Sequence, residues 1–348
     1  MGTDFVMQNT LFDAPEDAAS TPLKKSSKIV EPATANPELI ALAQTLPPHL
    51  RLGASSWNYP GWAGLVWDGE YPETNLSRYG LNAYAKHPLF RTVSVDRGFY
   101  RPLNVAQFAE YASQVDQDFR FVVKAPSLIT DALIRDESGR GMRPNAHFLN
   151  AAEAVQMFVE PALEGLGHRL GALVFQISPL PNTWFTRMPE LINRLHHLLK
   201  AIPDFRHTAP DGVVAVEVRD PQWLTPQFVN ALRDTGATYC MGLHAKMPSI
   251  NEQLPILRAL WPGPLVCRWN LNPLHGAYGY EDAQQAYSPY DKMMDPDVET
   301  RTTLAKVISG TANAGQNVYV TLSNKAEGSA PLSVIELAKA IHASPMGT

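Results

Sequence analysis

The chain has 348 residues, of which 45% are hydrophobic and 18% are charged. This length allows one large α/β domain or two medium ones. A net charge of −5 argues against a surface that is basic overall, as in many nucleic-acid-binding proteins, although a local basic pocket is compatible with it. The two cysteines, Cys240 and Cys267, lie in apolar runs, so the sequence contains neither a disulfide framework nor a CxxC metal motif.

The first 35 residues are rich in Ala, Pro, Ser and Asp, which predicts a disordered leader over 1–35 followed by a single domain over 36–348. Acidic residues stand where a signal peptide would have its apolar region, and no run approaches the ~18 apolar residues of a membrane helix. We therefore expect a cytoplasmic protein without a membrane partner.

Eight short β-rich runs follow in chain order, each succeeded by a stretch with helical periodicity. They are 51–57, 92–96, 120–126, 172–177, 213–219, 238–243, 265–270 and 317–324. Alternation of this kind is typical of a parallel sheet, and eight units favour a closed (β/α)₈ TIM-type barrel. An open doubly wound sheet would need a glycine fingerprint just after a strand, whereas the glycine-rich stretch 165–171 precedes one.

Three strand-to-helix links are long, namely 58–75, 127–149 and 271–298. In a (β/α)₈ barrel all such links lie on the face where active sites are found. Neutral insertions are the alternative interpretation. The last link contains His275 and the tyrosines 278, 280, 287 and 290, which predicts either a lid over a ligand or a surface loop fixed by its aromatic rings.

Polar residues occupy the inward positions at the carboxyl ends of the predicted strands. Because alternate strand residues face opposite ways, valines 214, 216 and 218 would face the helices while Glu217 and Arg219 face the barrel axis. The same alternation places six further side chains inside, namely Ser94, Asp96, Lys124, Gln176, Arg268 and Asn270. Buried charges must pair, reach solvent or meet a ligand. A closed network, for example Glu217 with Arg219 or Lys124, is the alternative to a binding site.

Six motifs in this order resemble those of the DUF72 (YecE-like) family: 53–62, 93–102, 121–131, 173–181, 216–223 and 319–334. The resemblance spans about 50–345 and implies a TIM barrel, but it implies no particular reaction. The matching positions are Trp57, Phe99, Tyr100, Lys124, Pro126, Thr130, Gln176, Glu217, Arg219, Trp223, Arg268, Asn324, Gly328 and Pro331.

The sequence departs from the family pattern at several motif positions. Ser94 and Asp96 replace the acid and amide of a Val-Glu-Ile-Asn motif, Asp131 and Asp220 replace histidines, and Asn270 stands in a modified Arg-x-His-Gly motif. These changes put a proton-transfer role at those places in doubt. They are compatible with a divergent member that has another substrate or only binds one.

The inward residues favour anion chemistry. Lys124, Arg219 and Arg268 bring three cations together, and guanidinium groups match phosphate or carboxylate. Glu217, Asp96 and Lys124 are the catalytic candidates, with Glu217 favoured for general acid/base work because nearby cations would keep it ionised. The candidates for substrate binding are Trp57, Tyr100, Gln176, Arg219, Arg268, Asn270 and Asn324. Trp269 is a further aromatic candidate, as a wall against a sugar or base.

We expect no metal and no cofactor. His244, Asp96 and Glu217 are the candidates for a mixed metal site, but no HxH or HExxH spacing supports one. The stretch 323–331 resembles a phosphate-binding turn before a helix, although its Ser, Gly and Pro are also ordinary turn residues.

The leading hypothesis is an enzyme of hydrolase or isomerase type that acts on a small phosphorylated or carboxylated substrate at the mouth of the barrel. A non-catalytic ligand-binding or regulatory barrel and a nucleic-acid-processing protein are the alternatives, the latter disfavoured by the acidic net charge. The sequence leaves the substrate and the oligomeric state open.

Overall fold

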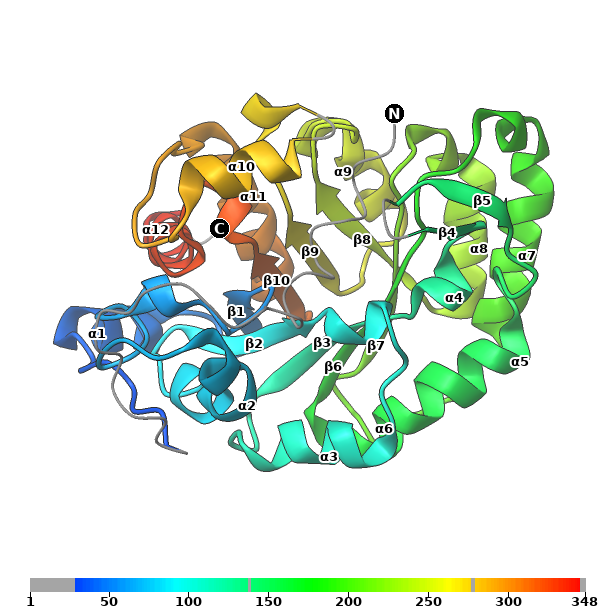
Figure 1. The fold of residues 1–348 in the computed structure, drawn as a ribbon. Helices are drawn as coiled ribbons and strands as arrows, with labels where there is room; N and C mark the ends of the chain where they lie inside the picture. The colour runs from blue at the N-terminus through cyan, green and yellow to red at the C-terminus, as the bar shows by residue number, and fades with distance from the viewer. Residues whose placement is uncertain (1–28, 137–138, 277–278, 345–348) are drawn as a thin grey trace.

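The computed structural model describes residues 29–136, 139–276 and 279–344. Eight parallel strands close into a barrel in the order β1-β10-β9-β8-β7-β6-β3-β2, and helices surround them (Figure 1). The strands are β1 (Leu50–Ala54), β2 (Phe90–Val95), β3 (Arg120–Lys124), β6 (Leu170–Gln176), β7 (Val213–Glu217), β8 (Thr238–Leu243), β9 (Leu265–Trp269) and β10 (Val318–Leu322). Each of them falls on a predicted run, so the predicted (β/α)₈ barrel is confirmed.

Helices connect successive barrel strands and form the outer layer. Their bounds are α2 (Glu73–Tyr84), α3 (Val105–Ser113), α4 (Ser127–Thr130), α5 (Ala151–Ala154), α6 (Glu160–Leu166), α7 (Met188–Ala201), α8 (Pro226–Thr235), α9 (Ile250–Ala259), α10 (Tyr280–Tyr287), α11 (Val298–Asn313) and α12 (Ala330–Ala343), with α1 (Pro37–Thr45) before the first strand. Local signals set their ends. Asn104 and Gln107 form a capping box at the start of α3, and Gly236 ends α8 at φ 70°.

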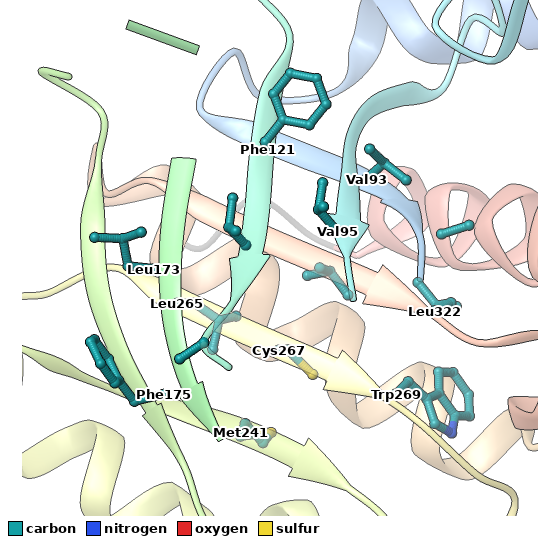
Figure 2. Packing of buried hydrophobic residues seen from close by; sticks show 14 of the residues in the cluster. Val93, Val95, Phe121, Leu173, Phe175, Met241, Leu265, Cys267, Trp269 and Leu322 are labelled. Carbon is teal, nitrogen blue, oxygen red and sulfur yellow. The ribbon is translucent and has the colours of Figure 1, made fainter. Parts of the chain in front are cut away.

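The strands separate two apolar regions. Their outward side chains pack beneath the helices, and Figure 2 shows Val93 and Val95 of β2 with Phe121 of β3 and Leu173 and Phe175 of β6. A smaller cluster fills the inside of the barrel, formed by Val122, Ala172, Val174, Ala215, Cys240, Val266 and Tyr319. This division confirms the predicted alternation. Below the inner cluster, at the amino-terminal end of the barrel, Arg51 and Arg120 pair with Asp211.

The long links after β1, β3 and β9 contain short elements of their own. The link after β3 forms a hairpin, β4 (Leu133–Arg135) with β5 (Gly141–Pro144), which the sequence analysis did not predict. The link after β9 contains α10, and the link after β1 contains the short helix η1 (Pro60–Trp62). All three follow carboxyl ends of barrel strands, so the additional structure lies on the face that carries the polar residues.

The described chain begins before the predicted domain boundary. Val30 is buried in the core, Pro32 bridges to Trp67, and the Ala33 amide donates to the carbonyl of Val66 at 2.9 Å. Residues 29–35 are thus ordered, although they belong to the range predicted as a disordered leader; residues 1–28 lie outside the described residues. No helix in the described ranges has both the length and the apolar character that a membrane span requires.

Candidate functional site

A ring of polar side chains lies inside the barrel at the carboxyl ends of its strands. Lys124 ends β3, Gln176 ends β6 and Glu217 ends β7, while Arg268 is the penultimate residue of β9. The strand register places Gln176 beside Glu217. Asp96 and Asn270 directly follow β2 and β9, and Arg219 lies two residues after the end of β7; they complete this set, which we call the mouth ring.

Glu217 is the centre of the mouth ring. Its carboxylate is fully buried, accepts from Arg268 Nη1 at 2.7 Å and from Asn270 Nδ2 at 3.2 Å, and forms an ion pair with Arg219 Nη2 at 2.8 Å. Burial alone would raise the pKa of Glu217, but the two guanidinium groups outweigh burial and hold it below its usual value. The carboxylate therefore stays ionised and fully engaged with protein donors.

Gly242 of β8 makes room for this carboxylate. A Cβ atom at position 242 would lie 3.2 Å from Glu217 Oε1, closer than an ordinary van der Waals contact. Gly242 is also the register partner of Arg268 on the next strand. The glycine thus allows a glutamate and an arginine to meet inside a narrow barrel.

Arg268 joins the two carboxylates of the ring. Its Nη1 donates to Glu217, its Nη2 donates to Asp96 Oδ2 at 2.6 Å, and Gln176 Oε1 accepts from Nη1 at 3.1 Å. The Ser94 hydroxyl donates to the other oxygen of Asp96 at 2.6 Å. The side chain of Asp96 is 13% exposed, compared with none for Glu217, so Asp96 is the carboxylate that solvent can reach.

Lys124 lies within the field of these charges. Only 6% of the residue is exposed, and its Nζ stands 3.5 Å from the centroid of the Phe99 ring. Burial lowers the pKa of Lys124 to about 7; the charge of Asp96 opposes this shift, whereas Arg268 and Arg219 add to it. A lysine of this kind exchanges its proton near neutral pH.

His244 lies just after β8; the sequence predicts a hydrogen-bonded scaffold residue or, less favoured, a metal ligand at this position. Its Nδ1 accepts from the amide of Lys246 at 3.1 Å, which assigns the ring proton to Nε2. Burial and the nearby Arg219 lower its pKa to about 2, so the imidazole is neutral. It contributes a hydrogen-bond donor beside the ring, a role that no spacing in the sequence indicates.

Tyr280, at the start of α10, extends over the mouth ring. Its hydroxyl accepts from Arg219 Nη1 at 3.2 Å, and its ring lies 5.4 Å from that of His244. The other described tyrosines of this link are engaged elsewhere, with the Tyr287 hydroxyl on Asp295 and the Tyr290 ring against Tyr59. Tyr278 lies outside the described residues. The link thus places one aromatic residue at the site and fixes the others at the surface.

The remaining candidates are divided between the ring and its surroundings. Tyr100 belongs near the ring, since burial and then the charge of Asp96 raise its pKa. Trp57 instead packs edge-on against Tyr111 of α3 at 5.3 Å. Asn324 accepts from Trp62 Nε1 and from the amide of Ala330, so it connects η1 to the start of α12.

Trp269 does not belong to the ring. Its side chain faces the helices and lies in the outer apolar cluster, as Figure 2 shows. The prediction that Trp269 contributes to an aromatic wall at the site is therefore wrong. Alternation along β9 already requires this result, because Arg268 and Trp269 are neighbours and face opposite ways.

The residues that depart from the family pattern form hydrogen bonds or ion pairs within the barrel. Asp131 is buried and pairs with Arg135 at 2.7 Å while accepting from the Leu133 amide, which supports the β4–β5 hairpin. Asp220 accepts from the Leu180 amide at 2.8 Å. Ser94 and Asn270 donate to the two carboxylates of the ring, as described above. Each substituted position is thus tied into the scaffold.

Two further features bear on ligands. Within the described ranges, no three His, Cys, Asp or Glu side chains gather as metal ligands. A hollow of about 460 Å³ lies between α9 and α11 near the starts of β8 and β9, with mainly apolar walls. It is at the opposite end of the barrel from the mouth ring and shares no residue with it.

Comparison with known proteins now gives the family. The family described as "Protein of unknown function DUF72" matches residues 51–347. The chain belongs to this family. No curated protein matches it.

Solved structures agree with the fold. A DUF72 family protein from Enterococcus faecalis is 18% identical, with 85% of this chain and 96% of that chain covered and a TM-score of 0.54. A DUF72 family protein from Thermotoga maritima is 19% identical over 83% and 98% of the two chains, with a TM-score of 0.47. An α-L-fucosidase matches at 12% identity over 88% and 97%, with a TM-score of 0.31. The first similarity shows the barrel fold alone; the other two are too low to carry an argument.

Proposed function

We propose that this DUF72 protein is an enzyme that binds a small anionic substrate, carboxylated or phosphorylated, at the mouth ring and carries out acid/base chemistry of the isomerase or hydrolase type. The observation that carries the proposal is the charge balance of the ring. The ring contains three basic groups, Lys124, Arg219 and Arg268, and two carboxylates, Glu217 and Asp96. It therefore carries one net positive charge when Lys124 is protonated. A buried surplus charge is costly, and an anionic ligand would relieve that cost.

Arg219 is the best candidate for contact with the anion. One side of its guanidinium is held by Glu217 and Gln176, while Nη1 bonds only the neutral hydroxyl of Tyr280 among the described residues. A carboxylate or phosphate would be a stronger acceptor than a phenol at this position. Arg268 is already shared between two carboxylates and serves to hold them.

The geometry favours Asp96 and Lys124 as the proton-transferring groups. Asp96 is the more exposed carboxylate, and Lys124 has a pKa of about 7. Glu217, which the sequence favours for this work, accepts from Arg268 and Asn270, forms an ion pair with Arg219 and is shielded from solvent. We assign it the role of positioning the two arginines.

Binding of inorganic phosphate and pyruvate, measured by calorimetry, tests the anion site. We expect Arg219→Gln to weaken binding by about tenfold or more, since a charged hydrogen bond contributes roughly 1.5–3 kcal/mol. Arg206→Gln is the matched control, because Arg206 pairs with Asp204 in an exposed link far from the ring. If neither anion binds the wild-type protein, or if Arg219→Gln binds them as tightly as wild type does, the proposal is contradicted.

Turnover distinguishes an enzyme from a binding protein. Wild-type protein is incubated with a panel of small carboxylates and sugar phosphates and followed by NMR. We expect Asp96→Asn to slow any conversion by about 100-fold or more. Asp118 has its carboxylate at the other end of the barrel, so Asp118→Asn should leave the rate of conversion unchanged. Binding without conversion would favour a non-catalytic barrel, which the structural roles of Asp131 and Asp220 support as the second candidate.

A further inference from the structure

We infer that Lys124 is a nucleophile that forms a covalent imine with the carbonyl carbon of a small oxo acid, a molecule in which the carbonyl group lies close to a carboxylate. The inference rests on the proposed anion site, because it assigns the substrate class of that same site. It goes beyond proton transfer, since it gives Lys124 a bond to carbon.

The first argument is the position of the amine. Lys124 ends β3 and faces the barrel axis, where its Nζ lies over the Phe99 ring. Arg219 and Arg268 share the acceptors of the ring, namely Glu217, Gln176 and Asp96. Among the described residues, no hydrogen bond or ion pair occupies the Lys124 amine. An amine held in this way, nine-tenths buried and facing the charged groups of the mouth ring, has its nitrogen available to a ligand.

The second argument is the protonation state. The charged groups around Lys124 are Asp96 after β2, Glu217 and Arg219 at the end of β7, and Arg268 on β9. With burial as the largest cause, they set its pKa at about 7. At neutral pH roughly half of the molecules therefore carry a free amine with a lone pair on nitrogen. Desolvation beside other cations is the established way in which proteins activate a lysine as a nucleophile.

The third argument is the arrangement of the anion site. Lys124 is the register partner of Val174, two residues before Gln176, and Gln176 Oε1 accepts from both Arg219 and Arg268. The amine and the two guanidinium groups therefore lie at the same end of the barrel, and both guanidinium charges help to lower the pKa of Lys124. We infer that a substrate carboxylate bound by Arg219 presents its adjacent carbonyl carbon to Nζ. This arrangement favours oxo acids as substrates over simple phosphates or carboxylates, which have no electrophilic carbon beside the charge.

The chemistry balances without any co-reactant. The nitrogen lone pair forms a C–N bond to the carbonyl carbon, and one proton passes from nitrogen to oxygen to give a carbinolamine. The hydroxyl then leaves as water with the second nitrogen proton, through Asp96 as proton carrier. Protonation of the resulting imine makes it an acceptor for electrons from the neighbouring carbon, which is how isomerases that use lysine remove a proton there.

Borohydride trapping of the full-length protein tests the inference. The protein is incubated with pyruvate, 2-oxobutyrate, 2-oxoglutarate or glyoxylate, reduced with sodium borohydride, and analysed by intact mass and peptide mapping. We expect a reduced adduct on Lys124 with at least one of these acids, at about tenfold or greater excess over the exposed Lys200. Trapping should increase with pH around a midpoint near 7.

Two variants make the result specific. Lys124→Arg keeps a cation in the ring but cannot form an imine, so it should lose the adduct; Lys200→Arg should retain it. Adduct on Lys325, whose Nζ lies 5.5 Å from the centroid of the Tyr280 ring, or on surface lysines alone would overturn the inference, as would the absence of adduct with all four acids. If pyruvate binds by calorimetry but no Lys124 adduct forms, the imine is wrong while the anion site stands. If no anion binds, the proposed function itself fails.

Discussion

The amine of Lys124 is buried in the barrel beside two guanidinium groups, although a buried charge ordinarily needs a counter-ion of its own. Asp96 lies near enough to favour its charged form, but that carboxylate is bonded to Arg268 and Ser94. A residue held in this way reduces stability. Natural proteins retain such residues mainly at functional sites, where activity compensates for the lost stability.

Replacement of this amine should stabilise the protein in a pH-dependent way. The pKa of Lys124 is about 7 in the folded protein, against 10.5 for a free lysine. Below pH 7 both folded and unfolded chains hold the proton, and the folded state carries the full cost of the buried charge. Between these two values the unfolded chain binds more protons, so the free energy of unfolding of wild type rises with pH.

We therefore expect Lys124→Met to raise the free energy of unfolding at pH 6 by ~3 kcal/mol, with the gain shrinking towards pH 10. Urea unfolding at pH 6, 8 and 10 measures it. Lys200→Met serves as the control, because Lys200 is half exposed and should give no such trend. A Lys124→Met protein less stable than wild type at pH 6 would show that the charge is compensated.

At the scale of the element, the register of the strands places the residues of the mouth ring at one end of the barrel. Alternation along each strand is visible in the sequence, so the inward positions of Lys124, Gln176 and Glu217 could be predicted. The hairpin β4–β5 was missed because its strands are short and lie within a long link. Hydrogen-bond partners inside the ring were also beyond the sequence, since they depend on distances of a few tenths of an ångström and on side-chain rotamers.

Gly242 of β8 provides a test at this scale. An added methyl group would lie 3.2 Å from Glu217 Oε1, and Glu217 cannot retreat freely because Arg268 and Asn270 donate to it and Arg219 pairs with it. We expect Gly242→Ala to lower the free energy of unfolding by about 1–2 kcal/mol. Gly310→Ala, within α11 and with no atom within 4 Å of the new Cβ, should raise it by about 0.5–1 kcal/mol. Equal effects in urea unfolding would remove the steric argument.

At the scale of the whole molecule, closure of the sheet brings the site together. Asp96, Lys124, Glu217 and Arg268 come from strands far apart in the chain, and the sequence could predict their meeting because parallel strands in a barrel end on one face. The sequence could not predict which charged groups of the ring pair with one another. Glu217 pairs with two arginines and Arg268 pairs with two carboxylates. Among the described residues, Lys124 is therefore the charged group of the mouth ring that has no ion pair.

The amino-terminal segment is the other whole-molecule feature that composition misjudged. Residues 29–35 fall within the stretch whose average composition predicts a leader, yet Val30 is buried, the Asp68 amide donates to the Glu31 carbonyl at 3.1 Å, and the Ala33 amide donates to the Val66 carbonyl. Composition averages over a window, whereas one buried valine and a few backbone hydrogen bonds are enough to anchor a short stretch.

A chain that begins at residue 29 should consequently be more stable than one that begins at residue 36. Burial of Val30 contributes about 1.5–3 kcal/mol, and the backbone hydrogen bonds of the segment add to it, so we expect the longer chain to have the higher free energy of unfolding. Urea unfolding of the two truncated chains measures it. Val30→Ala in the longer chain should lower the free energy of unfolding by about half of this difference, because it removes only the apolar burial. If the two chains unfold at the same urea concentration, the segment rests on the barrel without stabilising it, and the domain begins where composition places it.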